Sequence, residues 1–268
     1  MPVLSHVSLA PPGLIASVPW TPAVLGGSVV GWWDALDAAT FTLNGENVAA
    51  WANKGAAGGA AVQTTGANQP AYSASARNGR PGVVAGSGGK KLSFTTVVPG
   101  LPTGNAASTL AVVGVDTSGG GNAYLFGYGT AATGQMRTLV TAPPNVVLAH
   151  FGAANDTSSV LSWTHLDRIV VADVGAGVNP TSNLVVDGGG PQSKTITTLN
   201  TTTAGGFIFA RPSGSGGEWL GVVQEILVFN RVLTTTERRK LEGYLAWRWS
   251  VVANLPSGHP YKSSAPYV

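Results

Sequence analysis

One stretch near the C-terminal end carries apolar residues at helical spacing. The apolar positions are Leu241, Tyr244, Leu245 and Trp249, and the charged residues among them lie largely off this face. Thr234 followed by Glu237 is a capping box, in which the threonine hydroxyl accepts from the backbone N–H three residues on and the glutamate reaches back to the cap. The pattern predicts a helix over 235–249 whose apolar face docks on a sheet.

The chain between residue 28 and this helix is a series of short apolar runs separated by glycine-rich segments. The runs are rich in Val, Leu, Ile, Thr and aromatic residues, as strands are. They cover 28–34, 92–96, 108–116, 123–128, 135–141, 145–151, 160–163, 168–174, 183–187, 194–199, 206–210 and 218–229. Many short strands with one late helix predict an all-β sandwich of two antiparallel sheets.

Residues 1–27 have a different pattern, in which prolines are interleaved with apolar residues. The prolines argue against a helix and favour an extended chain. An extended apolar segment needs a groove or a sheet edge, so we expect either a docking arm along a neighbouring subunit or a strap across its own sandwich. The docking arm would use Val7, Leu9, Leu14, Ile15 and Trp20.

Charged residues make up 10% of the chain, against about 25% in ordinary soluble domains. A surface of small, uncharged residues fits either built-in assembly into oligomers or a neutral extracellular surface. The net charge is only +3, and apart from Arg238, Arg239 and Lys240 the basic residues are scattered. Nucleic-acid binding needs several phosphate contacts from one basic face, so we expect no nucleic-acid partner and a solvated basic cluster.

The chain has no cysteine, which excludes disulfides and thiolate metal sites. Its first basic residue is Lys54, so no positively charged segment of a signal peptide precedes the first apolar run. No stretch approaches the 18 apolar residues of a membrane span. We therefore expect neither export by a signal peptide nor membrane insertion.

Distinctive motifs lie near both ends of residues 28–268. The first part carries GWWDALDA at 31–38, VAAWANK at 48–54 and NGRPGV at 78–83, and the last part carries the helix followed by LPSGHPY at 255–261. This combination resembles concanavalin A-like, LamG-type jelly-roll modules of bacteriophage virion proteins and bacterial surface proteins. Where relatives commonly have Phe-Asp-Gly, this chain has Val84-Ala85-Gly86. The resemblance implies one jelly-roll domain over 28–268 with its helix at 235–249.

The resemblance also implies structural roles for residues of these motifs. Trp32, Trp33, Trp51, Trp219, Trp247 and Trp249 are expected in the core or against the helix. Arg248 falls inside the apolar face of the helix, and a buried guanidinium needs a carboxylate. Its expected partner is Asp34 or Asp37 of the opening motif, unless its side chain reaches outward to solvent.

Catalytic patterns are missing from the sequence. The 12 acidic residues contain no Glu-x-Asp-x-x-Glu strand of the kind that laminarinase-type glucanases use. Glu218 and Glu225 are seven residues apart on one predicted strand and would lie on opposite faces. The four histidines have no zinc-binding spacing, and His259 is expected to make a structural hydrogen bond. We therefore expect a protein that is not an enzyme.

Concanavalin A-like modules often hold calcium in loops, so the loops with acidic residues are candidate calcium sites. The candidates are Asp116 with Asn122, Asn155 with Asp156, and Asp187. Calcium takes 6 to 8 oxygens, usually with several carboxylates, and each loop offers one. We expect no cofactor, with calcium as the weaker alternative.

Aromatic and planar polar residues of the middle strands are the candidate ligand-binding set, because sugars bind to such combinations. They are Asn122, Tyr124, Tyr128, Arg137, His150 and Trp163. The alternative is that strand alternation buries the aromatic members in the core.

These observations lead to one functional expectation with three competitors. We expect a structural protein on the virion surface, a capsid decoration or head fibre, made without a signal peptide. It would contact other virion proteins through its N-terminal arm, form homo-oligomers and bind host-surface polysaccharide. The alternatives are a tail receptor-binding tip, a free carbohydrate-binding lectin and, third, a glycan hydrolase.

Overall fold

The computed structural model describes residues 18–96, 100–118, 121–152, 155–214 and 216–268, with the side chains of residues 95 and 96 excepted. These residues form 17 strands and one α-helix, and every pairing between strands is antiparallel. The predicted all-β, antiparallel architecture is therefore confirmed. None of the helices in this part of the chain is long and apolar enough to cross a membrane.

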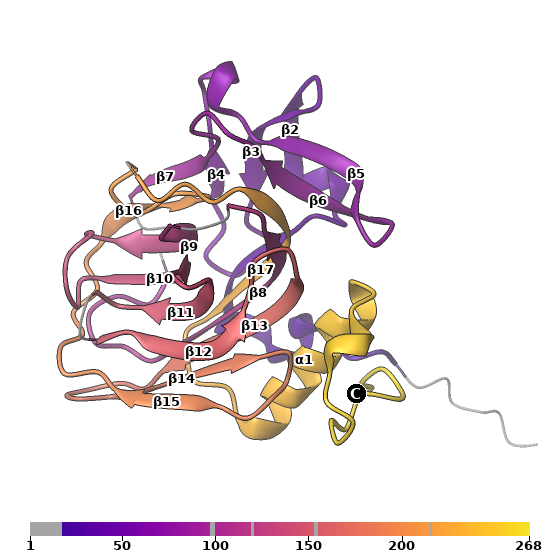
Figure 1. Cartoon of the computed structure of the whole chain (residues 1–268), viewed down its shortest axis with the longest axis vertical. Coiled ribbons are helices and arrows are strands. Elements are labelled where there is room, and N and C mark those ends of the chain that lie inside the picture. The colour runs from indigo at the N-terminus through magenta and orange to yellow at the C-terminus, as the bar shows by residue number, and fades with distance from the viewer. Residues whose placement is uncertain (1–17, 97–99, 119–120, 153–154, 215) are drawn as a thin grey trace, which may run out of the picture.

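Twelve of the 17 strands form two ladders of six. In the first, neighbouring strands are β1 (Val29–Asp34), β17 (Gly221–Phe229), β8 (Ser108–Asp116), β13 (Asp167–Val174), β14 (Thr181–Val186) and β15 (Gln192–Thr195). In the second they are β7 (Leu92–Thr96), β16 (Ala204–Ile208), β9 (Ala123–Gly129), β10 (Met136–Ala142), β11 (Val146–His150) and β12 (Thr157–Ser162). Figure 1 shows the second ladder on the left of the molecule.

The two ladders pack face to face around one core. The ring of Trp33 on β1 lies 5.5 Å from that of Phe126 on β9 and 6.3 Å from that of Phe94 on β7. β8 and β17 occupy the middle of the first ladder and are buried along their whole length. Their near-continuous apolar sequences follow from this position, since a strand covered on both faces loses the alternation of a half-exposed one.

Five further strands lie between the opening motif and β7, and the sequence patterns did not predict them. They are β2 (Phe41–Asn44), β3 (Asn47–Ala52), β4 (Ala60–Val62), β5 (Ala71–Arg77) and β6 (Arg80–Ala85). Through β6–β17 and β4–β7 they join the two ladders, at the top of Figure 1. Asn78 and Gly79 both have positive φ in the turn between β5 and β6. Asn-Gly between strands is a strong hairpin signal, and the NGRPGV motif accordingly forms the turn and the start of β6.

The helix forms as predicted. α1 spans Thr235–Arg248 with both hydrogen bonds of the capping box in place. Leu241, Leu245 and Trp249 are completely buried. Nε2 of His259 lies 3.0 Å from Oε2 of the buried Glu242, which is the structural hydrogen bond expected for this histidine. The basic cluster, in contrast, is bound to its own chain. Arg238 contacts Glu242, Arg239 donates to the Gly188 carbonyl and Lys240 to that of Tyr267.

The described part of the N-terminal segment is a strap. Trp20 is buried, its backbone N–H donates to the carbonyl of Pro266 at 2.9 Å, and its ring meets the Tyr244 ring of α1 edge-on. A 3-10 helix follows at Pro22–Ser28, against the expectation of no helix, because proline is tolerated in a first helical turn. Val7, Leu9, Leu14 and Ile15 lie outside the described residues.

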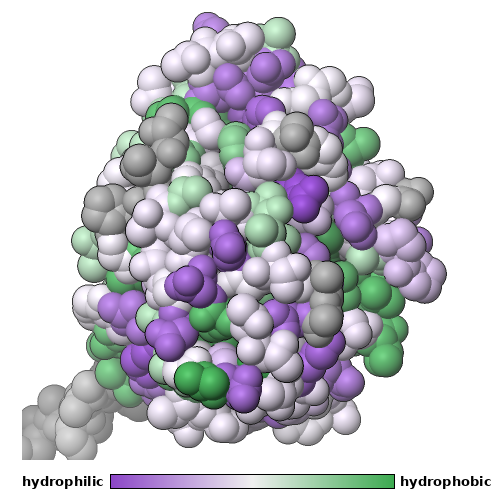
Figure 2. Space-filling view, turned by 90° about the vertical axis from the view of Figure 1, so that its left-hand side faces the viewer, coloured by the Kyte–Doolittle hydropathy of each residue, from purple (hydrophilic) through white to green (hydrophobic). Residues whose placement is uncertain are grey.

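The surface matches the low content of charge. Figure 2 shows the side of the molecule that carries the second ladder, where residues of intermediate hydropathy dominate and apolar residues occur in separate patches. Small polar and apolar side chains cover most of this face. It can therefore contact other molecules without removing many charges from water.

Candidate functional site

A polar groove of about 310 Å³ opens where β8 ends and β9 begins. Its lining consists of Ser87, Ser118, Gly121, Asn122, Ala123, Gly217, Glu218 and Leu220. We call it the rim groove. Hydroxyl groups, an amide and one carboxylate face it, and Asn122 and Glu218 are exposed. Glu218 accepts from the backbone N–H of Gly89 at 3.2 Å, which ties the segment before β17 to the neighbouring loop.

Asp116, at the end of β8, adjoins this groove and is completely buried. Its Oδ1 accepts from the backbone N–H of Ser118 at 2.8 Å and from the Ser118 hydroxyl. Its Oδ2 has no hydrogen-bond partner among the described residues. A buried carboxylate oxygen without a donor is uncommon, so this predicted calcium position keeps a free ligand atom.

At the other two calcium candidates, side-chain oxygens accept hydrogen bonds or form ion pairs within the chain itself. Asn155 accepts from Thr197 and donates to Thr198, and Asp156 accepts from two backbone N–H groups at 3.2 Å. Asp187 accepts from Ile169 and pairs with Arg168. The described part of the chain contains no group of three or more His, Asp or Glu residues able to hold a metal ion. Calcium at Asp116 and Asn122 stays a prediction.

Two of the predicted ligand residues meet beside the rim groove. The hydroxyl of Tyr124 lies 3.5 Å from Nε2 of His150, and Nδ1 of His150 lies 2.7 Å from Oδ1 of Asp156. The Arg211 guanidinium stands 5.9 Å over the Tyr124 ring. Burial raises the pKa of Tyr124. Tyr124 is only 5% exposed, because Gly217 lies directly on its ring, where a Cβ would come within 2.4 Å of it.

Tyr128, Arg137 and Trp163 are buried, and none of them lines the rim groove. Tyr128 and Arg137 are cross-strand partners on β9 and β10, whose residues are all buried, and Trp163 directly follows β12. Tyr128 donates to the Pro102 carbonyl at 3.1 Å and Trp163 to that of Gly114 at 3.0 Å. Arg137 donates to the Ala106 carbonyl at 2.6 Å and to Thr201 at 2.9 Å, and burial lowers its pKa.

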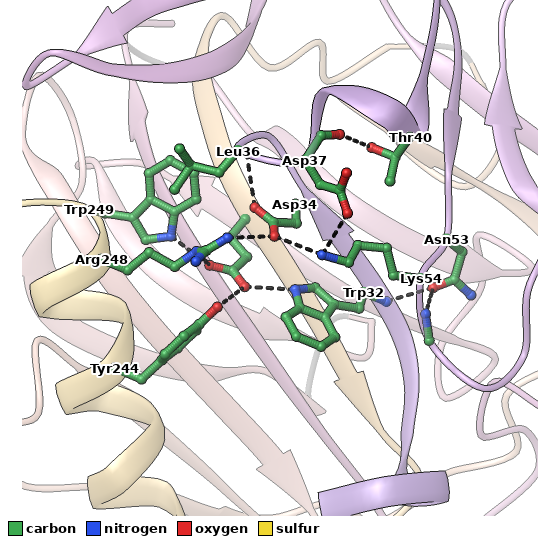
Figure 3. A network of polar contacts seen from close by, with 12 residues as sticks. Trp32, Asp34, Leu36, Asp37, Thr40, Asn53, Lys54, Tyr244, Arg248 and Trp249 are labelled. Atoms are coloured by element: carbon green, nitrogen blue, oxygen red, sulfur yellow. Dashed lines mark hydrogen bonds and ion pairs between the residues drawn. The ribbon is translucent and has the colours of Figure 1, made fainter. Parts of the chain in front are cut away.

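Between the first ladder and α1, a buried cluster of charged residues joins the two end motifs (Figure 3). Asp34 and Glu225 are direct cross-strand partners on β1 and β17, and both are completely buried. Arg248 of α1 reaches Asp34 at 2.7 Å and Glu225 at 3.6 Å, and Lys54 lies 3.0 Å from Asp34. The predicted Arg248–Asp34 pair is therefore confirmed.

Asp37, the alternative partner, instead pairs with Lys54 at 2.9 Å, and that contact lowers the pKa of Asp37. It lies farther out than Asp34, with 36% of its side chain exposed. The opening motif thus supplies one buried and one half-exposed carboxylate to the same lysine. The two aspartates are not equivalent.

Glu225 is the member of the cluster that sequence patterns missed. Its Oε1 accepts from the indole N–H of Trp32 at 2.7 Å and from the Tyr244 hydroxyl at 3.2 Å. Its Oε2 accepts from the indole N–H of Trp249 at 2.6 Å. Burial, reinforced by the neighbouring Asp34, raises the pKa of Glu225 to about 7. Two tryptophans expected near the core needed acceptors, which was the signal that could have pointed to this residue.

Trp247 is not a core residue, contrary to expectation. Its side chain is 40% exposed, whereas Trp33, Trp51, Trp219 and Trp249 are completely buried and Trp32 is half-buried. Helical geometry explains the difference, since Trp247 is two positions from both Leu245 and Trp249 and faces away from the sheet.

All 12 acidic residues lie in the described part of the chain. Two-carboxylate glycoside hydrolysis needs both groups at one accessible site, about 5 to 10 Å apart. Asp34 and Glu225 are close together but sealed from solvent. The rim groove contains one carboxylate, that of Glu218. Together with its serine hydroxyls and the Asn122 amide, this carboxylate can form hydrogen bonds with a polar ligand.

The fold is similar to parts of larger solved proteins, whereas no protein-family model and no curated protein sequence matches the chain. A GH54 α-L-arabinofuranosidase soaked with a cyclic sulfate inhibitor aligns with a TM-score of 0.56 and 13% identity over 73% of this chain and 50% of its own. Trypanosoma rangeli sialidase in complex with sialic acid aligns with a TM-score of 0.55 and 17% identity over 87% of this chain and 36% of its own. This chain thus spans half or less of either protein, and at these identities the likeness concerns the fold alone.

Proposed function

We propose that this protein is a non-enzymatic, glycan-recognising module with a concanavalin A-like jelly-roll fold, displayed on the surface of a bacteriophage particle. Two six-stranded antiparallel ladders with a helix docked beside them support the jelly-roll assignment. The pairing of Arg248 with Asp34 supports it further, since it links the opening and closing motifs by which the sequence resembles this family.

Assembly into a particle is the second part of the proposal. A chain with 10% charged residues exposes a surface of small side chains that can pack against other virion proteins or further copies of itself. Because residues 18–27 are tied to their own domain, a docking arm would be confined to residues 1–17. The role of Val7, Leu9, Leu14 and Ile15 in contacting other virion proteins stays a prediction.

Glycan recognition rests on the rim groove, and this is the observation that carries the proposal. It joins an amide, a carboxylate and two hydroxyl side chains in one open depression, the kind of polar set that orients a sugar. One accessible carboxylate suffices for binding and falls short of the pair that hydrolysis needs. Of the two enzymes of similar fold, the arabinofuranosidase was soaked with a cyclic sulfate inhibitor and the sialidase was solved with sialic acid.

A panel of bacterial surface polysaccharides, presented to the full-length protein, tests the proposal. The protein should bind at least one of these polysaccharides and release no reducing sugar from it. Asn122→Ala and Glu218→Gln should each weaken binding about 10-fold, since the first removes a hydrogen bond and the second replaces a charged acceptor by a neutral one, at about 1 to 1.5 kcal/mol each. Glu46→Gln is the matched control, because Glu46 is another exposed glutamate and lies outside the groove.

Two results would contradict the proposal. Binding that is indifferent to both groove variants would remove the rim groove as the glycan site. Sustained release of reducing sugar that Glu218→Gln abolishes would make the protein a glycan hydrolase.

A further inference from the structure

A second depression, of about 380 Å³, lies between α1, the strap and the C-terminal tail. Its lining consists of Pro19, Trp20, Thr21, Leu36, Arg80, Tyr244, Trp247, Arg248, Ala265 and Pro266. We call it the helix-side cleft. It shares no lining residue with the rim groove and none with the candidate ligand set from the middle strands.

Trp247 supplies an aromatic face to this cleft. It is the most exposed of the eight tryptophans, all of which lie in the described part of the chain. Its indole N–H donates to the Tyr261 carbonyl at 2.9 Å, so the orientation of the ring is fixed before anything binds. A large exposed aromatic surface held in place costs hydration free energy, which an occupant would recover.

Two guanidinium groups line the same cleft. Arg248 is held by Asp34 and lies 5.5 Å from the centre of the Tyr244 ring, with 29% of its side chain still exposed. Among the described residues, the side chain of Arg80 makes one hydrogen bond, from Nε to the Ser250 hydroxyl at 3.4 Å, and has no acidic partner. No acidic side chain lines the cleft. The charge of Arg80 therefore favours an anionic occupant.

The size and chemistry of the cleft select the class of ligand. Its volume is that of a small-molecule site, whereas a stable protein interface needs a contact of about 1,000 Å² or more. An aromatic face accepts the apolar face of a sugar ring, and a guanidinium binds a carboxylate through two parallel hydrogen bonds. We propose that the helix-side cleft binds a carboxylate-bearing saccharide, with the sugar ring on Trp247 and the carboxylate on Arg80.

Calorimetric titration of the full-length protein tests this proposal with two acidic probes, trigalacturonate and 3′-sialyllactose. Fully methyl-esterified trigalacturonate has the same rings without the charge. We expect binding of at least one acidic probe, about 10-fold weaker binding of its uncharged counterpart, and weakening as the salt concentration rises. For the sialyl probe, lactose is the uncharged comparison.

The variants Trp247→Ala and Arg80→Gln should each weaken binding of the acidic probe about 10-fold or more. Lys194→Gln is the control for Arg80→Gln, because Lys194 is an exposed cation on β15 outside the cleft, so the net charge changes equally. Thermal unfolding of each variant checks its fold, and Arg80→Gln serves if Trp247→Ala does not fold. Glu218→Gln should leave the acidic probe bound as before, which separates this site from the rim groove.

Several outcomes would overturn the proposal. No binding of either acidic probe at millimolar concentration excludes the assigned ligand class. Equal binding of acidic and uncharged probes removes the role of Arg80, and insensitivity to both cleft variants places the saccharide elsewhere. A poly-glutamate peptide that binds more tightly and responds to the same variants would identify the cleft as a site for acidic peptides instead.

Discussion

Individual residues decide how the two ends of this domain are joined. Two carboxylates directly opposite each other on neighbouring strands repel, and burial increases that cost. Asp34 and Glu225 tolerate this position because Arg248 and Lys54 supply positive charge and three N–H or O–H donors converge on Glu225 (Figure 3). The buried network therefore depends on all its members.

A double-mutant cycle at Arg248 and Asp34 tests this dependence. Arg248→Met should cost about 3 to 5 kcal/mol of unfolding free energy, because it leaves a buried carboxylate without its partner. Adding Asp34→Asn should recover about 1 kcal/mol or more of that loss. Asp37→Asn is the control, since Asp37 is half-exposed and pairs with Lys54, and its effect should be additive. Additivity at both positions in chemical denaturation would show that Asp34 is not coupled to Arg248.

The raised pKa of Glu225 predicts a particular pH dependence of stability. The pKa of about 7 in the folded protein lies above the ordinary 4.5, so the folded state binds this proton more tightly than the unfolded state. The contribution of Glu225 to the unfolding free energy should thus fall as the pH rises from about 4.5 to about 7, by at most about 3 kcal/mol. The contact with Arg231 lowers the pKa of Glu237 to about 2, so the contribution of Glu237 to the unfolding free energy changes only below about pH 4.5.

Denaturation measured from pH 5 to pH 8 isolates the contribution of Glu225 by comparison with Glu225→Gln. Burial also raises the pKa of Asp173 and Asp187, and their contributions remain in both proteins. The variant should therefore lose part of the downward slope. Parallel curves for the two proteins would mean that Glu225 does not titrate in this range.

At the scale of elements, the strap and the helix depend on each other. Trp20 lies 4% exposed against Tyr244 of α1, and the backbone of the strap bonds to Pro266 and Val268 of the tail. Trp20→Ala should cost about 3 to 5 kcal/mol in chemical denaturation, as large-to-small core changes do. Trp247→Ala is the matched control and should cost about 1 kcal/mol, largely its hydrogen bond to Tyr261. Equal losses would show that the strap is not part of the core.

At the scale of the whole molecule, the rim groove and the helix-side cleft lie on different elements. The strands β2–β6 join the two ladders, so each ladder presents one face to the common core. The rim groove opens beside β8 and β9, whereas the helix-side cleft lies between α1 and the two chain ends. The two depressions share no lining residue, so the two proposed ligands would bind at separate sites.

The sequence by itself determined what depends on neighbours along the chain. The capping box placed the start of α1, the short apolar runs between glycine-rich segments predicted an antiparallel all-β fold, and the position of Arg248 on the helix required a carboxylate partner. Only the tertiary structure decided between Asp34 and Asp37, placed Glu225 among its donors and put Tyr128, Arg137 and Trp163 inside while leaving Trp247 exposed. These outcomes depend on which strands pair and which faces meet, and residues hundreds of positions apart set them, so local spacing carries no information about them.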